Sequence, residues 1–211
     1  FFSGSCYFSD VGHTIYGLMF YVDSFIRDEN LLKEIQNEDL WKRFAPPNYN
    51  WWNGWWVSNP RNIFEYIIEN VWKQYGFEKN VAGFEYWSNL YPPGIGLEWH
   101  HDKDEAEARF NNKIVKPIIG MIYWVKIEDL KGGNLEVKWR GKTHTVEPKS
   151  NRLVLFNTGE PHRVTKVISG HRRAFLCNPW KSKPLTFKKG DHVDGKFNPV
   201  NAPAWVIPGL R

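Results

Sequence analysis

One short motif joins an imidazole and a carboxylate at a spacing that suits a metal ion. Residues 99–102 read Trp-His-His-Asp. Because side chains in a strand alternate between two faces, His100 and Asp102 point the same way if this stretch is extended. The two groups can fill adjacent positions around iron, and a second His would complete a two-His, one-carboxylate site with open positions. A chain with seven His also produces such a pair by chance, so at this point a structural role is an equal alternative.

A third candidate ligand and a candidate anion anchor lie further along the chain. The run Arg152–Phe156 predicts a strand, the following Asn-Thr-Gly-Glu-Pro predicts a turn, and His162 then stands at the head of the next strand. Arg172 follows a Ser-Gly turn. A guanidinium can donate two parallel hydrogen bonds to a carboxylate, and burying an Arg is tolerable only when such a partner arrives. By strand parity the small Ala174 shares the face of Arg172 and leaves room for that partner.

The second half of the sequence predicts a framework of strands that could position these residues. From Val81 onward, short runs rich in β-branched and aromatic residues are separated by turn residues. The predicted strands are Phe84–Trp87, Lys116–Ile127, Leu135–Trp139, Lys142–Val146, Arg152–Phe156, Arg163–Ile168 and Arg173–Cys177. Such closely spaced strands are typical of a sandwich or jelly roll.

The N-terminal part predicts one strand and two helices. Thr14–Tyr21 is rich in apolar and aromatic residues and predicts a strand. Asp23 or Ser24 can then cap a helix that runs to about Phe44. A second helix, over residues 59–75, carries apolar side chains at helical spacing.

We therefore predict a mainly β fold with flanking α, namely a double-stranded β-helix (jelly roll) with the N-terminal helices packed on one sheet. A chain of 211 residues can bury one sizeable core and is short for two independent domains. We expect residues 1–180, including the helices, to form that domain. Residues 181–211, with several Pro, Gly and Lys, predict an irregular C-terminal extension.

The loop between the two predicted helices is unusually rich in Trp. Four Trp lie within residues 51–56, and they fit neither the alternation of a strand nor the stripe of a helix. We therefore expect at least one exposed ring, and we predict that this loop forms part of a substrate entrance and not of the core. The alternative is that the loop caps the helices against the sheet.

Charge and cysteine content narrow the class of protein. The net charge of +5 is scattered through the sequence, which is weak support for a nucleic-acid partner. Two distant Cys predict no disulfide framework and favour a reducing, cytoplasmic compartment. No apolar run is long enough to span a bilayer, so we expect no membrane partner. Because the first residue is Phe, we expect a chain trimmed at its start.

Several motifs together resemble a known family. They are Tyr91-Pro92-Pro93-Gly94, His100-His101-Asp102, Gly132-Gly133-Asn134-Leu135, Leu153-Val154-Leu155-Phe156, and His162-Arg163-Val164 followed by Val167, Gly170 and Arg172. In order and spacing they resemble the 2-oxoglutarate and Fe(II)-dependent oxygenase superfamily, in particular its prolyl 4-hydroxylase-like branch. The resemblance covers residues 91–180.

The resemblance implies a role for each matching residue. His100, Asp102 and His162 would bind Fe(II), Arg172 would hold the far carboxylate of 2-oxoglutarate, and Tyr91 would lend its hydroxyl to the same molecule. The implied enzyme is a dioxygenase that hydroxylates a C–H bond while 2-oxoglutarate becomes succinate and carbon dioxide. Dioxygen and 2-oxoglutarate are the implied co-substrates, with ascorbate as an optional further cofactor.

Some positions depart from the pattern or stay open. Animal collagen-type prolyl hydroxylases carry Lys where this chain has Arg172, and Arg173 would be the anchor if the strand were shifted by one residue. We expect His101 to be a supporting or surface residue and His171 to face solvent. Asp104 and the neighbouring Glu105 are either a solvated charge run or substrate contacts.

The primary substrate stays open between several classes. The resemblance to the prolyl branch favours a peptidyl, prolyl-type side chain. Net charge and the many aromatic rings suit a nucleic-acid oxygenase that stacks a base. A small molecule or free amino acid is a third class. A non-catalytic jelly-roll binding module is the alternative outside enzymes.

Overall fold

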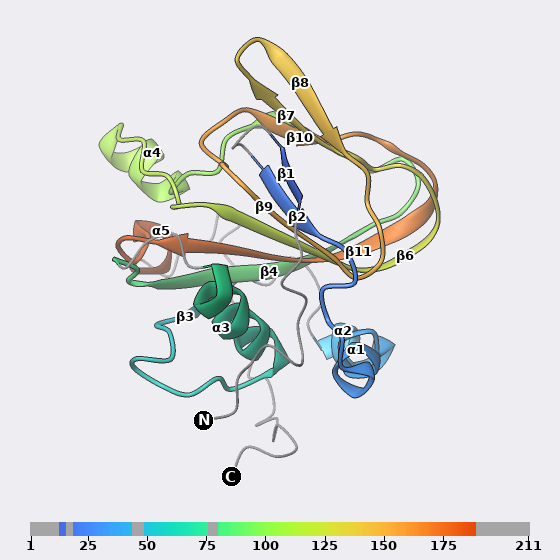
Figure 1. The fold of residues 1–211 in the computed structure, drawn as a ribbon. Helices are drawn as coiled ribbons and strands as arrows, with labels where there is room; N and C mark the ends of the chain where they lie inside the picture. Colours follow the sequence, from blue (N-terminus) through green and yellow to red (C-terminus); the bar gives the residue numbers. More distant parts are fainter. Residues whose placement is uncertain (1–12, 16–18, 44–48, 76–79, 189–211) are drawn as a thin grey trace.

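Two antiparallel sheets form the body of the protein in the computed structural model, which describes residues 13–15, 19–43, 49–75 and 80–188 (Figure 1). The strands are β1 His13–Ile15, β2 Met19–Val22, β3 Asn50–Trp52, β4 Gly83–Tyr91, β5 Leu97–His100, β6 Gly120–Gly132, β7 Leu135–Trp139, β8 Lys142–Val146, β9 Arg152–Phe156, β10 His162–Val164 and β11 Val167–Trp180. The helices are α1 Glu29–Ile35, α2 Glu38–Arg43, α3 Ile63–Tyr75, α4 Glu105–Asn111 and α5 Leu185–Lys188.

The major sheet has the strand order β1-β2-β9-β6-β11-β4-β3, and the minor sheet has the order β5-β10-β7-β8. Consecutive strands such as β9 and β10 lie in different sheets, so the chain crosses repeatedly between the two layers. This confirms the predicted mainly β, double-stranded β-helix fold. β6 and β11 form the longest contact in the major sheet and carry many of the side chains that face the minor sheet.

The described residues form two hydrophobic cores, one on each face of the major sheet. The first lies under α1, α2 and α3, where Phe64 of α3 packs on Phe175 of β11 with ring centroids 5.1 Å apart. Figure 1 shows these helices on the side of the sheet away from β7 and β8. The second core lies between the sheets and includes Trp124, Val137 and Phe156. The predicted packing of the N-terminal helices on one sheet is therefore confirmed.

The first predicted helix is wrong in its extent. The helix starts later than predicted, because the side chain of Asp23 pairs with Arg152 at 2.5 Å and does not cap a helix. Instead, Asp28 accepts a hydrogen bond from the backbone N–H of Leu31 at 2.7 Å and begins α1. Asn37 then interrupts the helix, and its side chain accepts from the N–H of Asp39 at 3.0 Å to begin α2. Side-chain capping at these positions competes with a continuous helix.

The boundary between the last two predicted strands is also wrong. The Ser-Gly pair at 169–170 predicted a turn, but Gly170 takes φ +67° inside β11 and forms an irregularity in its pairing with β6. The real break is at residues 165–166, where the chain leaves the minor sheet as β10 and enters the major sheet as β11. In the expected C-terminal extension, residues 185–188 form α5, and residues 189–211 lie outside the described part.

The Trp-rich loop packs on the helix-covered core. Trp52 is 1% exposed, and both Trp52 and Trp55 contact the ring of Phe84 with centroids 5.6 Å and 6.0 Å apart. Trp56 is 47% exposed, which confirms the expected exposed ring. The expectation that the loop lies outside the core is wrong for Trp52, which belongs to the core cluster around Phe84. Such a cluster can bury several rings that follow no simple period. The role in a substrate entrance stays a prediction.

Replacing Trp52 by Ala should therefore destabilise the protein. We expect the free energy of unfolding to fall by about 3–5 kcal/mol, because a buried Trp leaves a large cavity. The matched control is Trp56→Ala, where partial exposure predicts a loss of under about 1 kcal/mol. Urea unfolding followed by circular dichroism measures both, and equal losses in the two variants would show that this packing is misread.

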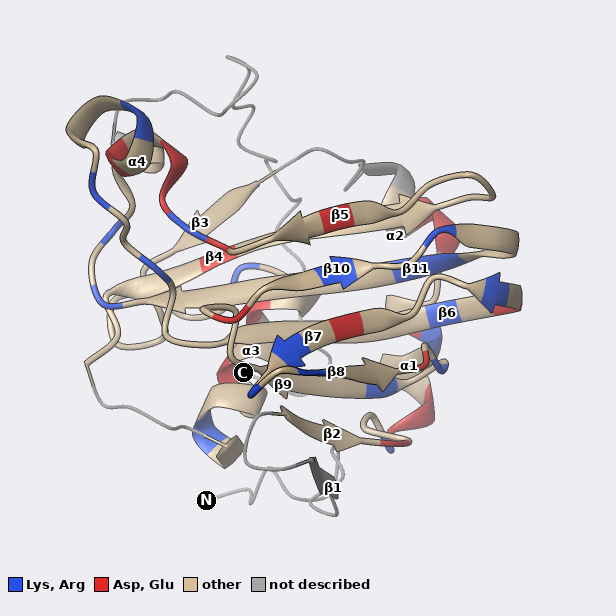
Figure 2. Ribbon diagram, turned by 90° about the horizontal axis from the view of Figure 1, so that it is seen from above, with Lys and Arg blue, Asp and Glu red and all other residues tan. Residues whose placement is uncertain are grey.

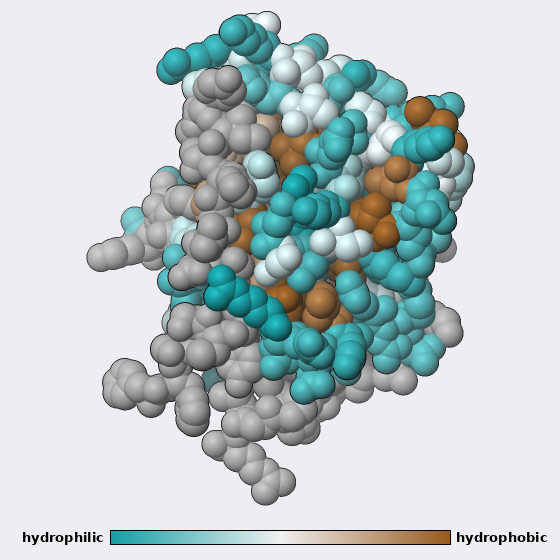
Figure 3. All heavy atoms as spheres, turned by 45° about the vertical axis from the view of Figure 1, so that its right-hand side comes forward, coloured by the Kyte–Doolittle hydropathy of each residue, from teal (hydrophilic) through white to brown (hydrophobic). Residues whose placement is uncertain are grey.

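The surface carries mixed charge and dispersed apolar groups. Figure 2 shows Lys, Arg, Asp and Glu interspersed along the strands of the minor sheet, and on the face in Figure 3 apolar side chains form small groups between hydrophilic ones. None of the described helices has the length and apolar character needed to cross a membrane. Cys177 is a buried free thiol, and Cys6 lies outside the described residues.

Candidate metal centre and its cavity

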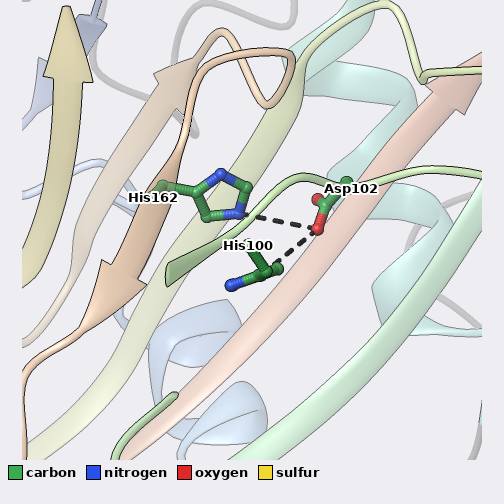
Figure 4. Close-up of side chains that lie close together, drawn as sticks. All are labelled: His100, Asp102 and His162. Atoms are coloured by element: carbon green, nitrogen blue, oxygen red, sulfur yellow. Dashed lines mark ion pairs between the residues drawn. The ribbon is translucent and has the colours of Figure 1, made fainter. Parts of the chain in front are cut away.

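Three side chains converge at the end of the minor sheet. His100 of β5 and His162 of β10 are paired across neighbouring strands, and their ring centroids lie 4.2 Å apart. Asp102 comes from the loop after β5, since the strand ends at His100. Its Oδ1 atom lies 3.5 Å from the Nε2 atom of each His, and one ligand atom from each residue lies within 4.8 Å of the others (Figure 4).

Both imidazoles are oriented by the backbone. Nδ1 of His100 hydrogen-bonds the carbonyl oxygen of Glu98 at 2.8 Å, and Nδ1 of His162 hydrogen-bonds that of Glu160 at 3.0 Å. A ring nitrogen that faces a carbonyl oxygen must carry the proton. In the neutral rings, the lone pair of each Nε2 atom is therefore free and points to the shared position, as a metal ligand requires.

The carboxylate of Asp102 is held so that one oxygen faces the two His. Oδ2 accepts a hydrogen bond from Nδ2 of Asn178 on β11 at 3.0 Å, which leaves Oδ1 toward the imidazoles. Burial raises the pKa of Asp102, but the interactions with His100, His162 and Asn178 outweigh burial and hold the pKa below its ordinary value. The group is thus ionised at neutral pH. Two imidazole nitrogens and one carboxylate oxygen suit Fe(II) and leave other coordination positions open.

A cavity of about 550 Å³ lies between the two sheets and contains this trio. Cavities of this size hold small organic molecules. Its wall on the major sheet is built from alternate residues of β4 and β11, and Arg172 and Tyr91 lie at one end of that wall as cross-strand partners. The structure therefore brings together in one cavity His100, Asp102, His162, Arg172 and Tyr91.

Arg172 is fully buried and has hydrogen-bonding capacity to spare. Nη1 donates to the carbonyl oxygen of Gly133, but Nε and Nη2 have no hydrogen-bond partner among the described residues. Burial lowers the pKa of Arg172 to about 10, and the ring of Tyr91 lies 5.3 Å from its guanidinium carbon. Two buried N–H groups without acceptors are costly, and a carboxylate would accept from both. This fits the far carboxylate of 2-oxoglutarate.

The neighbouring Arg173 does not reach the cavity. It lies on the opposite face of β11, where Nη2 donates to Glu38 at 2.9 Å. Of the two arginines, only Arg172 faces the cavity, as strand parity requires.

The other charged residues near the motif have varied roles. Nδ1 of the exposed His101 hydrogen-bonds the carbonyl oxygen of Gly159 at 2.9 Å. His171 is partly exposed and pairs with Glu128. Asp104 is 3% exposed, caps α4, and accepts from the hydroxyl of Thr186 in α5 at 2.9 Å. Asp104 therefore has a structural role, and of the open pair only Glu105 lines the cavity.

The sequence reasoning missed two polar residues of the cavity wall, Asn178 and Glu85. Asn178 lies six positions after Arg172 on β11, and Glu85 lies six positions before Tyr91 on β4. Oε2 of Glu85 accepts from Nε1 of Trp180 at 2.9 Å. Burial raises the pKa of Glu85 to about 8, and the negative charges of Asp102 and Asp104 add to the rise. Strand parity would have placed both residues on the cavity face, had the strands been predicted at full length.

Comparison with known proteins agrees with this geometry. Residues 86–180 match the sequence model of the 2OG-Fe(II) oxygenase superfamily. The curated 2-oxoglutarate and iron-dependent oxygenase domain-containing protein 3 of Rattus norvegicus is 41% identical over 59 residues, which is 25% of this chain and 19% of that protein. The Mus musculus protein of the same name matches equally. The matched part of the chain thus spans about a fifth of the length of these relatives.

Solved structures share the fold at low identity. A Pseudomonas putida prolyl-4-hydroxylase is 18% identical with a TM-score of 0.55, covering 78% of this chain and 88% of its own. A Trichoplax adhaerens prolyl hydroxylase, solved with a hypoxia inducible factor peptide fragment, is 16% identical with a TM-score of 0.56, covering 82% and 87%. A viral collagen prolyl hydroxylase from Paramecium Bursaria Chlorella virus-1 is 14% identical with a TM-score of 0.56, covering 79% and 97%.

Residues 86–180 therefore match the 2OG-Fe(II) oxygenase superfamily, and the fold is similar to that of prolyl hydroxylases. Fe(II) and 2-oxoglutarate are the cofactor and co-substrate that this family implies. The donor set of the trio and the spare donors of Arg172 fit both.

Proposed function

We propose that the protein is a 2-oxoglutarate- and Fe(II)-dependent dioxygenase that hydroxylates a C–H bond of a substrate in the cavity between the sheets. The observation that carries the proposal is one cavity that holds both the His100, Asp102 and His162 trio and the buried Arg172 with two unpartnered donors. A metal trio alone suits many reactions. The added carboxylate anchor is what selects a dicarboxylate co-substrate.

Each of these residues has a defined task in the proposed reaction. His100, Asp102 and His162 would hold Fe(II) and leave positions for 2-oxoglutarate and dioxygen. Arg172, with the hydroxyl of Tyr91, would hold the far carboxylate and so orient the molecule. Bound Fe(II), with dioxygen, supplies the oxidation that converts 2-oxoglutarate to succinate and carbon dioxide and places a hydroxyl on the substrate.

The substrate class is a further part of the proposal. A peptidyl side chain is favoured because the Trichoplax adhaerens neighbour was solved with a peptide. Interspersed charges on the minor sheet in Figure 2 give less support to a nucleic-acid strand, which prefers a basic groove. Small molecules and free amino acids also fit a cavity of about 550 Å³. A non-catalytic binding module has no use for a complete ligand set with two unpartnered donors.

A substrate panel tests the proposal directly. The protein is incubated with Fe(II), 2-oxoglutarate, ascorbate and air, together with blocked peptides, free amino acids or single-stranded oligonucleotides, and products are analysed by mass spectrometry. We expect one class to gain about 16 Da, the mass of one oxygen atom, in the wild type and not in His162→Ala. Addition of oxygen at the same rate by both proteins would contradict the proposal.

A further inference from the structure

The cavity wall on β4 has two chemically different ends. Positions 85, 87, 89 and 91 alternate onto the cavity face of this strand. Tyr91 is the cross-strand partner of Arg172, whereas Glu85 is the partner of Asn178, whose amide holds Asp102. Glu85 therefore lies at the metal end of the cavity, away from the proposed carboxylate anchor.

Among the residues that the structure describes, the carboxylate of Glu85 has no cationic partner. Within the described parts of the chain, its side chain accepts one hydrogen bond, donated to Oε2 by Trp180, and forms no ion pair. The nearby Asp102 and Asp104 are negatively charged, and their charges add to the rise that burial causes in the pKa of Glu85. A carboxylate taken out of water is costly unless a positive charge or several donors face it. With a pKa of about 8, Glu85 is largely protonated in the cavity at neutral pH, and a cation bound beside it would favour the ionised form.

Two aromatic rings stand next to this carboxylate along the cavity. Trp87 lies two residues from Glu85 on the same face of β4, and it stacks on Tyr49 with ring centroids 5.1 Å apart and planes at 26°. Both rings line the cavity. The face of an aromatic ring attracts cations and also packs against methylene groups. A carboxylate beside such rings complements a positively charged nitrogen on an alkyl chain.

The cavity's own cations do not occupy this position. Arg172 lies at the opposite end, and Lys103 at the rim pairs with Glu105 at 2.8 Å. Glu85 is thus the acidic group that an incoming molecule can reach without breaking an ion pair.

We propose that the cavity selects a substrate that carries an alkylammonium or guanidinium group, with this group held by Glu85, Trp87 and Tyr49. The carbon chain of the same molecule then lies beside Asp102 and the two His, where hydroxylation would occur. This inference rests on the proposed function and names its substrate class as cationic. The neutral ring of a prolyl residue uses neither the carboxylate nor the cation-attracting rings.

Binding experiments without turnover test this selection. Mn(II) replaces Fe(II), 2-oxoglutarate is present, and calorimetry compares acetyl-Gly-Xaa-Gly-amide peptides in which Xaa is Lys, Arg, Nε-acetyl-Lys, norleucine or Pro. Free lysine and n-butylammonium serve as small-molecule arms. We expect the charged probes to bind at least about tenfold more tightly than their neutral counterparts.

Variants assign the effect to particular side chains. Glu85→Gln keeps the shape and the acceptor for Trp180, and it should reduce the charged-to-neutral preference to under about twofold. Trp87→Leu removes the aromatic ring but not the carboxylate, and it should also weaken the binding of the charged probes. The matched control is Glu105→Gln, which alters another cavity carboxylate that is already paired and should keep the preference.

Three results would each overturn the inference: equal binding of charged and neutral probes, no binding of either, or an unchanged preference for charged probes in Glu85→Gln. These outcomes are separate from a failure of the proposed function. Succinate formation without any preference for cations would refute the cationic substrate alone, while a Glu85-dependent preference without any succinate formation would refute the oxygenase alone.

Discussion

Replacing Asp102 by Ala should abolish stoichiometric binding of a divalent metal. The change removes the charged ligand and leaves two neutral imidazoles, so we expect the affinity for Fe(II), or for Mn(II) as an air-stable substitute, to fall on the order of 100-fold or more. His100→Ala and His162→Ala should behave alike because the three ligand atoms face one point. Calorimetry and metal analysis after dialysis measure the effect.

The adjacent His101 provides the matched control for this result. It belongs to the same motif, but its ring faces Gly159 and not the trio. His101→Ala should therefore retain the metal with less than about a threefold change in affinity. Unchanged metal affinity in Asp102→Ala, in a protein with wild-type circular dichroism, would show that the trio is not the metal site.

Replacing Arg172 by Met should remove the response of the protein to 2-oxoglutarate. Loss of a charge-assisted pair in a buried site costs about 2–4 kcal/mol, which corresponds to a roughly 30- to 700-fold rise in the dissociation constant. Without 2-oxoglutarate, the variant should be as stable as the wild type or more so, since the wild type buries a charge with two unpartnered donors. With Mn(II) and 2-oxoglutarate, only the wild type should gain melting temperature.

Arg173→Met is the matched control for that prediction. Arg173 lies one position away but points to Glu38 on the other face of the sheet. Its replacement should leave unchanged the rise in melting temperature that Mn(II) and 2-oxoglutarate cause. If Arg173→Met lost the response and Arg172→Met kept it, the anchor would be misassigned.

Much of the proposed site could be predicted from residue types and strand parity. The order of the motifs identified His100, Asp102, His162 and Arg172 as candidates. Strand parity predicted that His100 and Asp102 point to one side, and they do, although β5 ends at His100 and Asp102 lies in the following loop. The spacing alone does not identify the pair, because His192-x-Asp194 repeats it in a segment outside the described residues. The combination with the later His and Arg carried the prediction.

Other parts of the structure could not be predicted because long-range contacts decide them. The role of Asp104 depends on Thr186, which lies far away in the sequence and contacts it only in the fold. Likewise, Asp23 is drawn from a predicted helix cap to Arg152, and the burial of Trp52 follows from its contact with Phe84. A local pattern contains no information on such partners, so tertiary contacts override the local preference.

The most direct test of the central claim follows the oxygen atoms. The protein is incubated anaerobically with Fe(II) and 2-oxoglutarate, ¹⁸O₂ is then admitted, and succinate is analysed by mass spectrometry. We expect succinate that carries one oxygen atom from ¹⁸O₂, formed by the wild type and by Arg173→Met but absent in Asp102→Ala and strongly reduced in Arg172→Met. Succinate formation no greater in the metal-loaded wild type than in Asp102→Ala would contradict the central claim.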